Sequence, residues 1–485
     1  MNGCLSVFRL ASLLGAGLAG LGGLACSPQP APDHDVDPEP VLSSLRVGEL
    51  CGEAPCGPVL RGAIAFLDRR PRGLDGNGRA CADCHMPVAA FQLAPADVEA
   101  RFRTLELRRQ RHPGADDPLF RPIDADDFRI NGDEASDYST LRQDALVRIT
   151  FPLPANVKLV DAATGAPSDE TFVDVWRAVP TVENVKLTGP DPDPPSWPCV
   201  EGGPPSPACV PRGPNPNGGY QYDARIADLQ EQARAAFTNH AQVQREPSRR
   251  MLDDLAAFES ALFSSEGLRA TSAAIDGGVT PQPDPDPPLD ALEQQGKVVF
   301  GRACAQCHGE AAAMHPAAGL HRYGDISTNC PRPVDGPQFP GYAGVARFTF
   351  PPCSPSLARK VRLYEITLPD GTKVRRPSSD PGRTLSTGVF IGRGPGDDWQ
   401  ALDTPSVRGV ARTAPYFHNN SAATLEQVLD HYDAFFKFVK VIAPTVDPTG
   451  RPLPRPPLLS TDGIHDDRPF VREEREALLA YLRKM

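Results

Sequence analysis

Residues 81–85 read Cys-Ala-Asp-Cys-His, and residues 304–308 read Cys-Ala-Gln-Cys-His. In this spacing one helical turn presents two thiols and an imidazole to a single macrocycle. The thiols form thioethers with the vinyl groups of a haem, and the histidine becomes the proximal ligand of its iron. A zinc site would need further Cys or His pairs nearby, and a thioredoxin-like motif gives no reason for the histidine. The motifs therefore predict two covalently bound haems c, held by Cys81, Cys84 and His85 and by Cys304, Cys307 and His308.

A weak internal repeat precedes the two motifs. Residues 61–68 read Arg-Gly-Ala-Ile-Ala-Phe-Leu-Asp, and residues 295–302 read Gln-Gly-Lys-Val-Val-Phe-Gly-Arg. Each segment places a glycine four residues before a phenylalanine, with an apolar pair directly ahead of that phenylalanine. The repeat favours two units of the same type.

Length and composition agree with more than one domain. The chain has 485 residues, and its 55 prolines and 42 glycines indicate many loops between short helices. The net charge of −11 argues against nucleic acid or an anionic membrane surface as partner, because both favour a basic face. Apolar residues recur at helical spacing in four segments, which we expect to be helices: 224–237, 249–263, 425–441 and 471–482.

The N-terminus has the pattern of an export signal. Arg9 is followed by a run of Leu, Ala and Gly that is too short and too rich in glycine for a membrane span. Leu24-Ala25-Cys26 resembles a lipoprotein cleavage box, but Gly23 stands where that box has leucine, so cleavage by signal peptidase I stays open. We expect residues 1–25 to be a signal peptide and the protein to be periplasmic. Membrane attachment, to the outer membrane, would come only through a lipid on Cys26.

Composition also marks boundaries further along the chain. Residues 26–49 are polar and rich in Pro and Asp, as a tether would be. Residues 276–290 have a similar composition and predict a linker between a unit at 50–275 and a unit at 291–485. We interpret two insertions in the first unit, at 93–168 and 190–219, as loops or small additions without assigned chemistry.

Six cysteines lie outside the two motifs and the leader, which itself holds Cys4 and Cys26. An even number in an exported protein predicts disulfides. The six form three local pairs, so the expected bonds are Cys51–Cys56, Cys199–Cys209 and Cys330–Cys353. The alternative is a set of free thiols.

The segment at residues 404–432 carries a family resemblance. It reads Thr-Pro-Ser-Val-Arg-Gly-Val-Ala-Arg-Thr-Ala-Pro-Tyr-Phe-His-Asn-Asn-Ser-Ala-Ala-Thr-Leu-Glu-Gln-Val-Leu-Asp-His-Tyr and resembles the C-terminal signature of the di-haem cytochrome c peroxidase / MauG family. The resemblance implies a mainly α fold with two cytochrome c-like domains, each with one covalent haem, plus loop-rich insertions. It further implies that the N-terminal haem reacts with hydrogen peroxide and that the C-terminal haem passes or stores electrons.

The resemblance also assigns roles near the first haem. Gln232 matches a glutamine of the distal pocket, but Gln242 stands where the family has an acidic residue, and an amide cannot shuttle a proton. His240 could replace that function, or it could be an exposed histidine at a helix end. Tyr222 matches the aromatic residue between the haems, which is usually Trp. It could relay an electron or be a packed tyrosine.

Tyr432 matches the distal ligand of the second haem. Thr424 and Gln427 form a Thr-x-x-Gln capping box, which predicts a helix that begins at Leu425. At about 100° per residue, Tyr432 lies at the centre of the apolar face and His431 is turned about 100° away. Ligation by Tyr432 is the expectation, and a core tyrosine is the alternative. The apolar face comprises Leu425, Val428, Leu429, Phe435, Phe436 and Val439.

Other polar positions have less defined roles. The asparagine of the family's calcium site is replaced by Ala178, while the carbonyls of Thr413 and Pro415 remain available, so calcium stays an open question. His112 is either a loop histidine or a sixth ligand of the first haem. His418 is expected near the second haem without ligating it.

Together these observations predict a peroxidase-type di-haem c oxidoreductase. Hydrogen peroxide would be the oxidant. A small cytochrome, a cupredoxin or an amino-acid residue of a partner protein would be the reductant. The main alternative is a di-haem electron-transfer protein without peroxidase activity, with both irons permanently six-coordinate. A third possibility is a haem enzyme that oxygenates an organic substrate.

Overall fold

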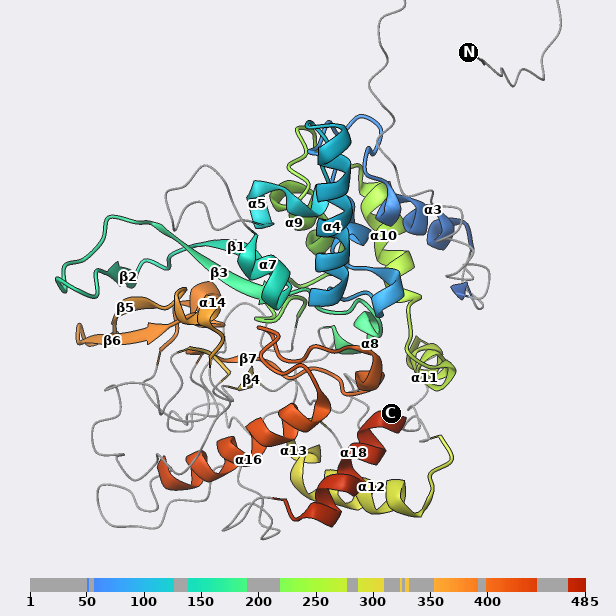
Figure 1. Cartoon of the computed structure of the whole chain (residues 1–485), viewed down its shortest axis with the longest axis vertical. Coiled ribbons are helices and arrows are strands. Elements are labelled where there is room, and N and C mark those ends of the chain that lie inside the picture. Colours follow the sequence, from blue (N-terminus) through green and yellow to red (C-terminus); the bar gives the residue numbers. More distant parts are fainter. Residues whose placement is uncertain are drawn as a thin grey trace, which may run out of the picture. The chain divides into compact units, whose positions relative to one another are not determined.

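Helices predominate in the part of the chain that the structure describes, with three small sheets beside them (Figure 1). The structure is a computed structural model that describes residues 50–51, 56–125, 138–189, 219–276, 287–308, 323–324, 328–330, 353–390, 398–442 and 470–485. The expected signal peptide and tether, the pair Cys199–Cys209 and most of the expected linker lie outside these residues. Among the described residues no helix is both long and apolar enough to span a membrane.

The four helices that the apolar spacing predicts are present as α9 (Leu229–Asn239), α10 (Arg249–Ser260), α16 (Leu425–Ile442) and α18 (Arg472–Lys484). α16 begins at Leu425, as the capping box predicts, and the N–H of Gln427 donates to Thr424 Oγ1 at 3.4 Å. α9 begins later than expected. The Asp228 side chain accepts the N–H of Glu231 at 2.7 Å and so fixes the start of this helix.

The repeat before the two motifs forms two matching helix crossings. α3 (Cys56–Leu67) packs on α10, and α12 (Ala291–Ala303) packs on α18. A Cβ on Gly62 would lie 1.9 Å from the Asp254 carbonyl oxygen, and a Cβ on Gly296 would lie 2.0 Å from that of Ala477. The two glycines therefore allow a backbone approach that no other residue permits.

The phenylalanines of the repeat complete the same contacts. Phe66 meets Phe258 edge-on, with ring centroids 5.3 Å apart, and Phe300 meets Tyr481 at 5.7 Å. A different buried apolar cluster surrounds each helix pair. The first helix of each crossing precedes one Cys-x-x-Cys-His motif, so the sequence repeat corresponds to two similar helix crossings.

The first insertion contains regular elements, so of the two expected alternatives it is a small addition and not a loop. It forms α4 (Pro95–Arg111), α5 (Pro122–Ala125), α7 (Ser139–Asp144), β1 (Leu146–Pro152) and β2 (Val157–Val160). α4 was not predicted, although Val98, Phe102 and Leu105 recur at helical spacing and pack in one apolar cluster, because most of its other residues are charged.

The sheets connect segments that are distant in sequence. β1 pairs antiparallel with β3 (Phe172–Ala178), from Leu146 opposite Ala178 to Pro152 opposite Phe172. β2 pairs with β5 (Arg362–Thr367), which in turn pairs with β6 (Lys373–Ser378). The insertion in the first unit is thus joined by backbone hydrogen bonds to a segment beyond the second motif.

The remaining described elements are α11 (Glu266–Asp276) and shorter pieces. The short pieces are η1 (Cys81–Asp83), η2 (Pro87–Ala89), η3 (Pro118–Phe120), α8 (Val185–Thr188), α13 (Ala305–His308), β4 (Tyr323–Gly324), α14 (Pro355–Ala358), α15 (Thr384–Thr387), β7 (Leu402–Asp403) and η7 (Val410–Arg412). β4 and β7 form the third sheet. The disulfides Cys51–Cys56 and Cys330–Cys353 are confirmed.

Candidate functional site

A cavity of about 490 Å³ is lined by both Cys-x-x-Cys-His motifs. Cys81, Cys84 and His85 contribute to its wall from the first motif, and Cys304 and His308 from the second. The side chain of Cys307 lies outside the described residues. Cys81 and Cys84 are free thiols, both half-buried, so neither is occupied by a disulfide. The wall is mainly apolar with a few polar groups, as small-molecule and cofactor sites usually are.

Each of the two motif histidines has a backbone carbonyl oxygen close to Nδ1. Nδ1 of His85 lies 3.2 Å from the Phe91 carbonyl oxygen, and Nδ1 of His308 lies 3.0 Å from that of Pro405. A carbonyl only accepts, so each ring donates from Nδ1 and keeps a lone pair on Nε2 for a metal. Burial lowers the pKa of His85 to about 4 and lowers that of His308, so both imidazoles are neutral near pH 7. This donor set fits a haem iron at each motif.

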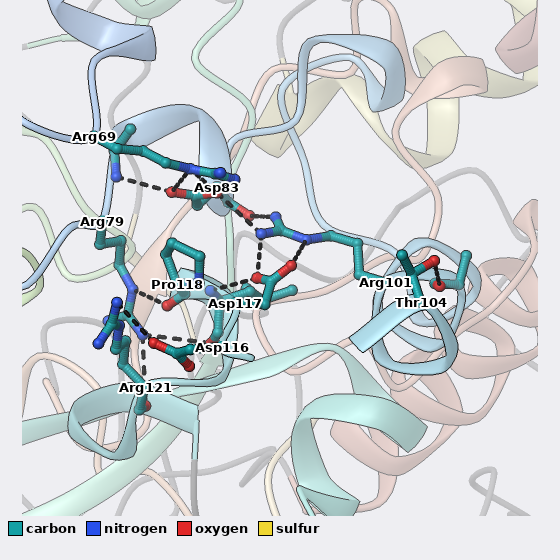
Figure 2. Close-up of polar contacts among 12 residues, drawn as sticks. Arg69, Arg79, Asp83, Arg101, Thr104, Asp116, Asp117, Pro118 and Arg121 are labelled. Carbon is teal, nitrogen blue, oxygen red and sulfur yellow. Dashed lines mark hydrogen bonds and ion pairs between the residues drawn. The ribbon is translucent and has the colours of Figure 1, made fainter. Parts of the chain in front are cut away.

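Asp83, inside the first motif, fixes the shape of that motif. Figure 2 shows it between Arg69 and Arg101, whose Nη2 atoms lie 2.6 and 3.0 Å from Asp83 Oδ1. Its other oxygen accepts the N–H of Ala80 at 2.9 Å. Burial alone would raise the pKa of Asp83, but the two guanidinium groups lower it overall. Because Arg101 lies on α4 and also pairs with Asp117, the first insertion helps to hold the motif in place.

α9 presents one face to the cavity. The lining residues Leu229, Gln232, Ala233, Ala236, Phe237 and His240 recur at helical spacing. Gln232 is half-buried, and His240 caps the C-terminus of the helix with its side chain 35% exposed. The prediction of a helix-end position for His240 is therefore right, but the ring lies at the cavity wall.

The other candidates for the first motif are at the surface. Gln242 is exposed, and its side-chain oxygen accepts from Asn77 Nδ2 at 3.2 Å. It does not line the cavity, and neither does His112, which is exposed at the end of α4.

Tyr222 and His418 line the cavity together. Their rings meet edge-on with centroids 6.2 Å apart, and burial raises the pKa of Tyr222. His418 is buried, with Nε2 3.0 Å from Asn329 Oδ1 and Nδ1 3.4 Å from Thr328 Oγ1. Both ring nitrogens of His418 are thus engaged by side chains, which agrees with a role other than iron ligation.

A buried ion network adjoins these two rings. Arg177 binds Asp380 through two bonds, of 2.6 and 3.0 Å, and reaches Asp223 at 3.0 Å. Arg225 completes the set, 2.7 Å from Asp223. Burial would raise the pKa of Asp223, but the two arginines lower it well below its usual value. The network fixes the backbone next to Tyr222, because Asp223 directly follows it.

α16 supplies another part of the cavity wall. Leu425, Val428, Leu429, Tyr432, Phe435 and Phe436 all line the cavity, as the predicted helical face requires. The side chain of Val439 lies outside the described residues. Tyr432 is half-buried and stacks on Phe436 at 5.7 Å. His431 is absent from the wall and is 1% exposed, with its ring 4.8 Å from that of Phe417.

The structure leaves the question of a calcium ion open. Thr413 and Pro415 line the cavity, but the described residues contain no group of three or more His, Cys, Asp or Glu side chains that could hold a metal ion. The backbone N–H of Ala178 donates to the His418 carbonyl at 2.6 Å.

Asp124 and Glu259 are cavity residues that the sequence did not indicate. Asp124, from the first insertion, lies beside His240 on the wall. Glu259 also lines the cavity and is 4% exposed, and its carboxyl group makes no hydrogen bond or ion pair with another described residue. Burial raises the pKa of Glu259 to about 8. In the two helix crossings Phe258 and Tyr481 occupy equivalent positions, against Gly62 and Gly296. Glu259 follows Phe258 and Leu482 follows Tyr481, and both of these following residues line the cavity.

Comparisons with known proteins give remote likenesses only. No family model matches the chain, and no curated protein sequence matches it. Among solved structures, a MauG-like protein associated with microbial copper homeostasis is 15% identical, with 88% of this chain and 87% of that chain covered and a TM-score of 0.38. Hydrazine synthase from Kuenenia stuttgartiensis is 12% identical, with 97% and 100% covered and a TM-score of 0.35. Likenesses this remote do not establish a family or a function.

Proposed function

We propose that the chain is a periplasmic di-haem c oxidoreductase that reduces hydrogen peroxide. The observation that carries the proposal is the shared cavity, on which both Cys-x-x-Cys-His motifs open together with Gln232, His240 and Tyr222. Bound haems would supply an iron that reacts with peroxide at the first motif and a store of electrons at the second. The sequence pattern of an export signal at residues 1–25 and the two disulfides support the periplasmic location.

The polar residues near the first motif suit peroxide as substrate. The reaction takes two electrons and two protons and converts hydrogen peroxide to two waters. The Gln232 amide can orient the peroxide by hydrogen bonds, and His240 can move a proton between its oxygens. Tyr222 would lie on the route by which electrons pass from the second motif.

The electrons would come from a small cytochrome, a cupredoxin or an amino-acid side chain of a partner protein. The net charge of −11 is compatible with a basic donor. A lipid on Cys26 would hold the enzyme at the outer membrane, and no nucleic acid is expected as partner.

Stopped-flow mixing with hydrogen peroxide tests the proposal. We expect a fast change in the optical spectrum of the wild type, slowed about 10²–10⁴-fold in His240→Ala because the proton carrier is lost. Gln242→Asn, at the surface position where the family has its acid, is the matched control and should react as the wild type does. A spectrum that excess peroxide leaves unchanged, in both the oxidised and half-reduced protein, would favour the electron-transfer alternative.

A further inference from the structure

His240 is held at both its backbone and its ring. Its carbonyl oxygen accepts from Asn77 Nδ2 at 2.9 Å and from Arg79 Nη1 at 3.2 Å. Its ring nitrogen Nδ1 lies 3.1 Å from Oδ1 of Asp124, the last-but-one residue of α5 in the first insertion. A histidine at the end of a helix would otherwise turn freely, so these contacts give the ring one orientation.

Asp124 is itself fixed by a buried arginine. Arg79 Nη1 pairs with Asp124 Oδ2, and the two residues are only 4% and 5% exposed. The guanidinium group is held in turn by carbonyl oxygens, that of Pro118 at 2.9 Å from Nε (Figure 2) and that of Leu119 at 3.4 Å from Nη2. Each carboxylate oxygen of Asp124 thus has a separate partner, one the arginine and the other the histidine.

This arrangement determines which ring nitrogen is available. A carboxylate paired with an arginine only accepts hydrogen bonds, so Nδ1 of His240 carries a proton and donates it. When the ring carries a single proton, the lone pair is therefore on Nε2. His240, Asp124 and Arg79 line the same cavity as His85 and Gln232, so a base is placed in the wall beside the first motif.

We propose that Asp124 is a positioning residue that sets the tautomer of His240, and that the first insertion thereby completes the peroxide site. The inference rests on the proposed function. Nε2 would accept the proton of one peroxide oxygen and deliver it to the other, so that this second oxygen leaves as water when the O–O bond breaks, while a haem at the first motif would hold the first oxygen and supply the electrons that the cleavage needs. Two electrons from the reductant and two further protons convert the first oxygen to the second water.

Asp124→Asn tests the assignment with little change of shape. Arg79 retains the amide oxygen, so the amide nitrogen faces Nδ1, which must then accept, and the ring proton moves to Nε2. We expect the reaction with peroxide to slow about 10²–10⁴-fold. Asp116→Asn is the matched control, because Asp116 is an exposed partner of Arg121 in the same insertion.

A second readout needs no turnover. In the ferrous protein with carbon monoxide, an Nε2–H in Asp124→Asn would donate to the ligand, so the C–O stretching frequency should fall relative to the wild type. If the wild type does not react with peroxide, the proposed function fails, yet this frequency still tests the tautomer. Unchanged frequency and unchanged peroxide rate in Asp124→Asn would overturn the inference.

A double-variant comparison separates positioning from mere packing. If Asp124 acts through His240, Asp124→Asn should slow the His240→Ala protein no further, whereas a purely structural role would add a second loss. Asp124→Asn leaves the buried charge of Arg79 unpaired, and this variant could therefore fail to take up haem. In that case the double variant Arg79→Gln with Asp124→Asn removes the charge as well, and its reaction with peroxide should still be slower than that of the wild type. A low-spin ferric wild type that becomes high-spin in His240→Ala would make His240 an iron ligand and also overturn the inference.

Discussion

Tyr432 and His431 are neighbours in sequence with different surroundings. Tyr432 lines the cavity, whereas His431 is fully buried against Phe417. We predict that Tyr432→Phe changes the ligand-field spectrum of the C-terminal haem and raises its reduction potential, because a tyrosinate ligand stabilises the ferric state. Electron paramagnetic resonance and a potentiometric titration measure both effects.

His431→Ala is the comparison for that prediction. It should lower the free energy of unfolding by creating a cavity around Phe417, and it should leave the haem spectrum as in the wild type. The opposite pattern, an unchanged spectrum in Tyr432→Phe and a changed one in His431→Ala, would transfer the ligand assignment to His431.

Glu259 gives a prediction for pH. Burial raises its folded-state pKa from 4.5 to about 8, so its contribution to stability is complete below about pH 4.5 and is lost as the pH rises to about 8. Between pH 5 and pH 8 the free energy of unfolding of the wild type should therefore fall by roughly a few kcal/mol more than that of Glu259→Gln, as the linkage relation requires. Denaturant unfolding at several pH values measures the difference, and a difference independent of pH would refute the assignment.

At the residue scale, the sequence predicts which side chains are present in the site but not how they are paired. The spacing of the two motifs identifies His85 and His308 as site residues, and the apolar period of α16 places Tyr432 on the helix face that lines the cavity. The partner of His240 could not be predicted, because Asp124 is 116 residues away and meets it only through the tertiary fold. The contact between Glu259 and the cavity likewise depends on how α10 packs on α3.

At the scale of elements, the two helix crossings depend on their glycines. In Gly296→Ala the new Cβ would lie 2.0 Å from the Ala477 carbonyl oxygen, so α12 must move away from α18. We predict a loss of about 1–3 kcal/mol in the free energy of unfolding, measured by denaturant titration.

Gly301→Ala in the same helix is the matched control. A Cβ at Gly301 meets no atom within 4 Å, so this change should instead gain up to about 1 kcal/mol from helix propensity. Equal effects of the two substitutions would show that the crossing does not depend on a close backbone approach at Gly296.

Helices were more predictable than strands, for a physical reason. The buried faces of α10, α16 and α18 have a local apolar period, so their own sequences indicate them. β2 and β5 pair across more than 200 residues of chain, and no local pattern specifies such a pairing. α4 was missed although Val98, Phe102 and Leu105 lie at helical spacing, because the rest of its sequence is mostly charged and pairs with other segments, as Arg101 does with Asp117.

At the scale of the whole molecule, two equivalent helix frameworks each carry one Cys-x-x-Cys-His motif, and both motifs line one cavity. The first insertion contributes Asp124 to the wall of this cavity. The central claim is therefore that the chain holds two covalent haems.

Haem stoichiometry, by pyridine haemochrome and intact mass of protein matured in a host that attaches haem c, tests this claim most directly. We predict two haems in the wild type. Cys81→Ala with Cys84→Ala should leave one haem with the spectrum of the second site, and Cys304→Ala with Cys307→Ala should leave one with the spectrum of the first. Any stoichiometry other than two in the wild type would contradict the account.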